Sequence, residues 1–181
     1  MAFWVIASIG MSGFIMGLVF LGTTLSWFFN TLPLNWLGIE SNLLGILLLG
    51  VPWTLLIIIM ALIVGLFSLS YHFLRRRNFL DVLLFPSLWI ISEYLRTWVF
   101  SILFSGKESL LGPHWTFVNL AYALAENQSF RFLAGIGGIY LVSFTVVLIN
   151  ALIFFLLIKR GNVRFVFPAV VIASVSFTYL F

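Results

Sequence analysis

Long runs of apolar residues make up most of this chain of 181 residues, of which 63% are apolar and 8% are charged. An average soluble domain is about 25% charged. The composition therefore predicts an all-α integral membrane protein, in which residues 1–181 form a single membrane domain. A helix that crosses a bilayer needs about 20 apolar residues, so we expect a bundle of about five transmembrane helices with short interfacial helices. The predicted spans are residues 3–29, 53–73, 80–104, 132–158 and 165–181.

Two segments between the runs have features of their own. Pro52 is expected to divide the apolar segment 43–77 into a short leading piece and the span that follows, because proline disrupts a helix interior. Residues 105–131 mix charged, amide, aromatic and turn residues. They are predicted to form an outer loop with a short interfacial helix near residues 117–125.

Small residues four positions apart predict where helices approach one another closely. Gly13 and Gly17 form one such pair in the first run, and Ala134 and Gly138 form a second in the fourth. The fourth run also carries polar side chains on one face. We expect them to hydrogen-bond to a neighbouring helix, and they are Tyr140, Ser143 and Asn150.

Basic residues predict the orientation, because cytoplasmic loops carry an excess of lysine and arginine. The three arginines at 75–77 follow one span, and Lys159, Arg160 and Arg164 follow another. Five spans then place the N-terminus in the cytoplasm and the C-terminus on the outer face. The net charge of +4 comes from these clusters beside apolar spans, so it indicates membrane orientation and no nucleic-acid partner.

Residues 86–100 combine an apolar helix pattern with two charges in its middle, Glu93 and Arg96. Residues three or four apart share a helix face, so Pro86, Trp89 and Phe100 lie on one stripe with the charges. A charge at the bilayer centre costs roughly 2.5–3.5 kcal/mol on insertion scales. The stripe should therefore face protein, water or a polar ligand. An ion pair that ties helices together and a direct functional role are both open interpretations.

Catalytic groups are scarce. The 181 residues contain no cysteine, so they hold no thiolate metal ligand and no cysteine nucleophile. His72 and His114 lack the spacing of metal ligands, and no metal site or cofactor is predicted. His114 beside Trp115 could act as a base at the outer interface, although a loop histidine that caps backbone groups is the favoured interpretation. No nucleophile and base lie at a suitable spacing, so no catalytic residue is predicted.

Three stretches resemble a known family. Residues 86–98 (PSLWIISEYLRTW) are similar to the P-A-L-W…E-x-L-R-x-W helix of bacterial apolipoprotein N-acyltransferases. Residues 135–152 (GIGGIYLVSFTVVLINAL) resemble the G-x-x-G-x-x-x-x-S-F…N-A-L helix of that family. Residues 21–27 (LGTTLSW) match the end of an earlier family helix, and the order and gaps agree from about Phe14 to Ile158.

The resemblance implies a function in the bacterial cytoplasmic (inner) membrane. These enzymes take an acyl chain from a phospholipid and place it on the N-terminal amine of a lipid-modified cysteine in a lipoprotein. The implied role of the bundle is to admit membrane phospholipid and lipidated apolipoprotein sideways from the bilayer. The chemistry belongs to a nitrilase-like domain on the outer face, where a Glu–Lys–Cys constellation forms a thioester.

The sequence departs from the family pattern in two ways. The nitrilase-like domain is not among these residues, so a separate nitrilase-like catalytic chain is an expected partner, and activity of this chain alone stays open. In the outer loop, the usual Gly-Phe-Pro-Trp and Gly-Tyr-Ser-Gln are replaced by residues 112–115 (GPHW) and 120–123 (LAYA). The chain would then be a truncated product, one half of a split enzyme, or a stand-alone bundle.

Seven side chains are the candidate substrate-binding groups of such a bundle, namely Trp27, Trp89, Glu93, Arg96, Trp98, His114 and Trp115. Two other functions remain open. A small substrate-binding membrane subunit of a transporter would use the Glu93 and Arg96 stripe in a pocket for a polar solute. A non-catalytic remnant would serve only as a membrane scaffold.

Overall fold

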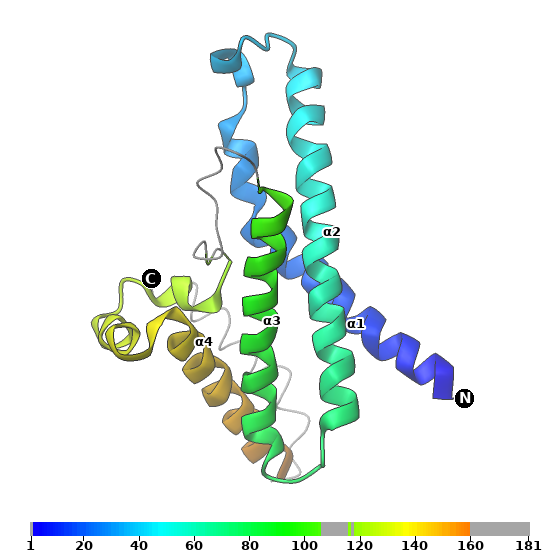
Figure 1. The fold of residues 1–181 in the computed structure, drawn as a ribbon, viewed down its shortest axis with the longest axis vertical. Helices are drawn as coiled ribbons and strands as arrows, with labels where there is room; N and C mark the ends of the chain where they lie inside the picture. The colour runs from blue at the N-terminus through cyan, green and yellow to red at the C-terminus, as the bar shows by residue number, and fades with distance from the viewer. Residues whose placement is uncertain (1, 106–115, 117, 160–181) are drawn as a thin grey trace. The chain divides into compact units, whose positions relative to one another are not determined.

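The computed structural model of this chain describes residues 2–105, 116 and 118–159, and this part is helical (Figure 1). Its long helices are α1 (Ala2–Thr24), α2 (Asn42–Leu74), α3 (Asp81–Leu103) and α4 (Gln128–Lys159). Three short 3-10 helices accompany them: η1 (Ser26–Thr31), η2 (Leu34–Leu37) and η3 (Leu120–Leu124). The all-α class is thus confirmed for the described residues, and the predicted span 165–181 lies outside them.

Within the described residues, three helical segments are long and apolar enough to cross a membrane. They are Trp4–Thr31, Asn42–Leu74 and Gln128–Leu156. The remaining long helix, α3, matches the predicted span 80–104 within one residue at each end. The chain divides into two compact units, Met1–Leu74 with Ser92–Val118, and Arg75–Ile91 with Asn119–Phe181.

In the first unit, α1 and α2 pack along each other through a seam of small residues (Figure 1). A Cβ atom added at Gly13 would lie 2.6 Å from the Cβ of Ser68 and 3.0 Å from the carbonyl oxygen of Val64. One added at Gly17 would lie 3.0 Å from the Cα of Ala61. Without side chains at these positions the two backbones come close, which increases van der Waals contact between helices in lipid. The predicted close approach at Gly13 and Gly17 is confirmed.

The helix α2 begins earlier than the predicted span. The Ser41 hydroxyl accepts a hydrogen bond from the backbone N–H of Leu44 at 3.4 Å, and the Ser41 carbonyl accepts one from Gly45 at 3.0 Å. Serine at this position is a favoured N-cap. The helix therefore starts at Asn42 and includes the leading apolar piece.

The prediction that Pro52 divides this segment is wrong, because α2 runs through it without interruption. Proline removes one backbone N–H, and the helix continues because membrane helices re-satisfy the freed groups locally. The nearby hydroxyl of Thr54 donates to the carbonyl of Gly50 at 2.7 Å. Apart from Gly45, the buried residues of α2 still fall inside the predicted span 53–73, and they are Leu56, Ile57, Met60, Ala61, Ile63, Val64, Gly65 and Phe67.

The first predicted span, 3–29, consists of an α-helix followed by a 3-10 helix. The α-helix stops at Thr24, and η1 continues the chain. The carbonyl of Leu25 accepts two hydrogen bonds, one from the indole N–H of Trp53 at 2.9 Å and one from the backbone N–H of Phe28 at 3.2 Å. The ring of Trp53 also meets Phe29 edge to face, with centroids 5.2 Å apart. This contact from α2 holds the end of α1 in the core.

In the second unit, α4 is broken by a kink. Gly137 (φ −131°, ψ 17°) and Gly138 (φ 69°, ψ −173°) are non-helical inside it. Only glycine adopts the combination found at Gly138 at low cost. No described atom lies within 4 Å of a Cβ added there, so the prediction that Ala134 and Gly138 form a close helix contact is wrong for Gly138. This glycine is required for the backbone conformation.

The helix η3 packs across this kink. Ala121 and Leu124 of η3 form a buried cluster with Val142 of α4, and partly buried residues from both sides of the kink surround the cluster. The backbone N–H of Ala121 donates to the Ser143 hydroxyl at 3.2 Å. Ser143 thus bonds to another segment as predicted, whereas the Asn150 amide donates to the Val146 carbonyl of its own helix at 2.9 Å. The short helix expected near residues 117–125 is confirmed as η3.

The α1–α2 seam predicts a specific response to added methyl groups. Gly13→Ala should lower the free energy of unfolding by about 1–3 kcal/mol, the usual cost of overpacking. Gly50→Ala is the matched control, because no described atom lies within 4 Å of its added Cβ. It should be neutral or stabilising, since alanine favours a helix over glycine by about 0.5–1 kcal/mol.

Denaturation of the purified variants in one detergent measures both effects. Gly13→Ala combined with Ser68→Gly should recover part of the loss, because the Cβ that collides with the new methyl group is gone. Equal stability of Gly13→Ala and Gly50→Ala would contradict the seam.

Candidate functional site: the buried face of α3

The helix α3 has two faces of opposite character. Its buried face includes all five residues of the predicted stripe, namely Pro86, Trp89, Glu93, Arg96 and Phe100. The opposite face exposes large apolar side chains at helical spacing, namely Ile91, Tyr94, Leu95, Trp98 and Ile102. The helix therefore buries its charges and exposes apolar groups, which is the arrangement expected of a helix in lipid. The predicted stripe is confirmed as the buried face.

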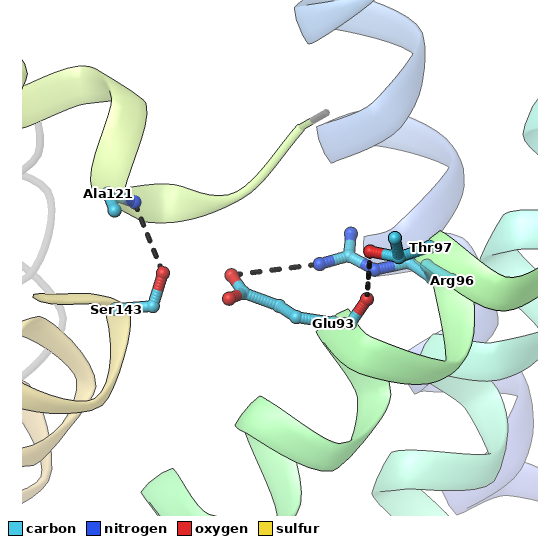
Figure 2. Close-up of polar contacts among 5 residues, drawn as sticks. All are labelled: Glu93, Arg96, Thr97, Ala121 and Ser143. Carbon is cyan, nitrogen blue, oxygen red and sulfur yellow. Dashed lines mark hydrogen bonds and ion pairs between the residues drawn. The ribbon is translucent and has the colours of Figure 1, made fainter. Parts of the chain in front are cut away.

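An ion pair occupies the middle of this face. Nη2 of Arg96 lies 3.7 Å from Oε1 of Glu93, one helical turn away (Figure 2). The exposed fractions of the two side chains are 4% and 0%. The hydroxyl of Thr97 donates to the carbonyl of Glu93 at 3.0 Å, so the backbone at the pair is hydrogen-bonded as well. Opposite charges at this spacing neutralise one another where no water reaches them.

The energetic consequence of this burial is asymmetric. Desolvating two charges costs several kcal/mol per ion, which their mutual attraction offsets only in part. Removing one partner is worse, because the remaining charge stays buried without its counter-charge, at a cost of roughly 3–5 kcal/mol. The pair is therefore expected to fix the rotation of α3 about its own axis, since any turn that moved one charge to lipid would separate it from polar surroundings.

The start of α3 is fixed by a second carboxylate. Asp81, predicted to lie in the first helical turn, is the first residue of α3. Its two carboxylate oxygens accept backbone hydrogen bonds from Arg76 at 2.8 Å and Arg77 at 2.7 Å. The carboxylate also lies beside the positive end of the helix dipole. The turn that carries the three arginines is thus held by an acid on the helix that follows.

The structure places the tryptophans of the candidate set in different environments. Trp89 is buried on the same face as the ion pair. Trp98 is 42% exposed on the opposite face, where its ring meets Tyr94 edge to face at 6.3 Å. Trp27 lies on η1 with 55% of its surface exposed, and its ring contacts Phe28 at 4.4 Å. His114 and Trp115 lie outside the described residues. Within the candidate set, Glu93 and Arg96 are in direct contact.

Sequence reasoning did not single out three other buried polar residues. Ser92 and Thr97 lie on the charged face of α3, and Asn119 lies in the second unit. The amide nitrogen and oxygen of Asn119 are buried and find no hydrogen-bond partner within the described part of the chain. For α3 a sequence signal existed: Ser92 and Thr97 lie four positions from Arg96 and Glu93, which places them on the same helix face. No sequence signal distinguishes Asn119 from an ordinary loop residue.

The geometry of the buried α3 face supports electrostatic and structural roles for Glu93 and Arg96. Within residues 2–105, 116 and 118–159, no three histidine, cysteine or acidic residues gather as metal ligands do. His72 packs its ring against Phe73 at 5.5 Å near the end of α2.

Among the described residues, long helices that expose apolar side chains, one of which buries an ion pair, indicate that the class of this molecule is a helical membrane protein. The comparisons with known proteins identify the particular family. The sequence model of the apolipoprotein N-acyltransferase N-terminal domain matches residues 2–152, and the chain belongs to this family. The suspected resemblance is thereby confirmed. No match was found among curated proteins or among solved structures.

The ion pair predicts that replacing one of its members destabilises the protein more than replacing both. Arg96→Leu should lower the yield of folded protein in membranes more than the double change Glu93→Gln with Arg96→Leu. The single change leaves a buried carboxylate without its counter-charge, at roughly 3–5 kcal/mol, whereas the double change leaves two neutral groups.

Membrane-fraction yield and detergent-resistant folding measure the difference. Arg75→Leu is the control for loss of a positive charge, because Arg75 is exposed and Arg76 and Arg77 remain in the same turn. Equal yields of the single and double variants would contradict pairing between the two side chains.

Proposed function

We propose that this chain is the membrane half of an apolipoprotein N-acyltransferase, which binds phospholipid and lipidated apolipoprotein for transfer of an acyl chain to the lipoprotein N-terminal cysteine. The family match over residues 2–152 carries this proposal. In this proposal the bundle presents its substrates within the membrane, since acyl chains hold both the phospholipid and the lipidated apolipoprotein there. The transporter-subunit and remnant-scaffold alternatives have no comparable support.

The chemistry requires groups that lie beyond these residues. Acyl transfer through a thioester needs a cysteine, and the 181 residues contain none. We therefore assign the covalent step to a nitrilase-like domain outside residues 1–181. Its cysteine would take the acyl group from the phospholipid ester and release the lysophospholipid. The lipoprotein amine would then take the acyl group from the thioester and free the thiol.

The exposed apolar face of α3 is the best candidate for the contact with acyl chains. Tyr94 and Trp98 are half exposed and meet edge to face, and aliphatic side chains continue the stripe on either side. Aromatic rings with a polar edge suit the depth between headgroups and acyl chains. In this proposal Glu93 and Arg96 hold α3 in place on the opposite face and act on substrate only through that positioning. Trp98 is the substrate-lining residue with the most support.

Reconstitution tests the function. The chain should be expressed with the nitrilase-like domain of a family member in bacteria depleted of their own N-acyltransferase. Mass spectrometry of a reporter lipoprotein measures N-acylation. We expect N-acylated product only when both parts are present and the catalytic cysteine is intact. Omission of either part and a Cys→Ala catalytic domain are the controls.

The outcome is interpretable because insertion can be checked separately. If both parts are inserted and folded, absence of N-acylation contradicts the proposal. Acyl transfer by the isolated chain would contradict the assignment of chemistry to another domain. Trp98→Ala should reduce the rate with either lipid substrate, whereas Trp36→Ala, which alters an exposed residue of η2, should not.

The proposed orientation follows from the basic residues at 75–77, which we place in the cytoplasm of a bacterial cell. The helix α2 spans about 50 Å at about 1.5 Å per residue, so its two ends lie on opposite sides of the membrane. The loop that contains Asn35 would then face outward. Asn78, in the turn before α3, would face the cytoplasm.

Single cysteines test this orientation against a background free of cysteine within the 181 residues. An impermeant maleimide applied to intact spheroplasts should label Asn35→Cys but not Asn78→Cys. Permeabilised spheroplasts should show labelling of both. The opposite pattern, or labelling of both from outside, would show that the orientation is wrong.

A further inference from the structure

The kink divides α4 into two helical parts of different length. Residues 139–159 are about 31 Å long at about 1.5 Å per residue, which alone matches a hydrocarbon core of about 30 Å. Residues 128–136 are about 13 Å long and cannot cross the core. Figure 1 shows the change of direction between the two parts. Residues 139–159 are long enough to cross the membrane alone, so residues 128–136 are not needed for the crossing.

The shorter part also begins as an independent helix. The side-chain oxygen of Asn127 accepts hydrogen bonds from the backbone N–H groups of Ser129 at 3.0 Å and Phe130 at 3.4 Å. This is the capping arrangement of a helix N-terminus. At the other end, Gly137 and Gly138 leave the helical region of backbone space. Residues 128–136, which we call the arm, are therefore bounded at both ends by local structure.

One face of the arm is fixed to the protein. Phe130, Leu133 and Ala134 are partly buried and pack against the cluster that Ala121 and Leu124 of η3 form with α4. The same cluster contacts Ile139 and Val146 beyond the kink. The helix η3 therefore contacts both parts of α4, and this packing holds the angle between them.

The free face of the arm is strongly apolar at one edge and charged at the other. Phe132 is 74% exposed and Ile136 is 68% exposed, and at a spacing of four they form one ridge. Arg131 is exposed on the polar side of this ridge. Tyr122 of η3 is also exposed. Basic side chains next to exposed aromatic and aliphatic groups are typical of helices that lie in the membrane interface.

We propose that the arm lies flat in the membrane–water interface and that its partner is the phospholipid bilayer. Phe132 and Ile136 enter the acyl-chain region, and the guanidinium of Arg131 contacts headgroup phosphates. Charge complementarity supports this partner, since a guanidinium matches phosphate geometry. Continuity supports it as well, because the arm leads directly into a part of α4 of spanning length. The inference does not depend on the proposed acyltransferase function.

Depth measurements on the full chain in phospholipid nanodiscs test the inference. Nitroxide labels are placed on single cysteines at Phe132, Ile136, Ile149 and Ile153, and collisions with oxygen and a water-soluble nickel chelate report depth. We expect equal, shallow depths at Phe132 and Ile136, and much greater depth at Ile149. Should Phe132→Cys fail to fold, Ser129→Cys on the same free face provides the same measurement.

Two results would contradict the proposal that the arm lies in the membrane interface. A steady increase of depth from Phe132 through Ile136 to Ile149 would mean that α4 enters the bilayer as one rod. Purely aqueous collision rates at Phe132 and Ile136 would mean that the ridge lies outside the bilayer.

The proposed contact between Arg131 and headgroup phosphates is tested separately, by the depth of the label at Ile136. In discs that contain anionic phospholipid, Arg131→Glu should move the label at Ile136 toward water, because a carboxylate is repelled by phosphate. Arg131→Lys is the control that retains the positive charge, and it should leave that label in place. An unchanged depth in Arg131→Glu would contradict the headgroup contact.

Discussion

The burial of Glu93 and Arg96 is the interaction on which the arrangement of α3 depends. In lipid the attraction between apolar surfaces gives little help, because acyl chains are as apolar as leucine. A buried pair of charges favours one rotation of the helix about its axis, because exposing either charge to acyl chains costs roughly 2.5–3.5 kcal/mol on insertion scales. With the pair 3.7 Å apart and shielded on one face, α3 presents Tyr94 and Trp98 on the other. The apolar surface that α3 exposes thus follows from where the charges are held.

Close packing makes the corresponding contribution in α1 and α2. Gly13 and Gly17 remove side chains at the point where the second backbone passes, and Ala61 and Ser68 are small on the facing side. Van der Waals contact then extends along the seam without the burial of water-exposed surface that drives soluble folding. Trp53 adds a directional bond at the end of α1. The first unit is therefore held by shape and by a few hydrogen bonds.

The glycines of α4 show why a residue pattern predicts some contacts and misses others. Gly13 with Gly17 and Ala134 with Gly138 have the same spacing, yet the first pair forms a seam and Gly138 forms a kink. A glycine permits close approach and unusual backbone angles equally, and only its neighbours decide between them. The continuity of α2 through Pro52 has a similar origin. Its cost is local, and the surrounding helix outweighs it.

The sequence by itself determined the all-helical class, the family, the position of α3 and its buried stripe. These features depend on composition and helical periodicity, which are local properties of the chain. Only the tertiary structure decided that Asn119 and Ser143 are buried, that Trp53 bonds to Leu25, and that η3 packs across a break in α4. Those contacts join residues far apart in sequence, and no local pattern encodes which distant group completes a hydrogen bond or covers a kink.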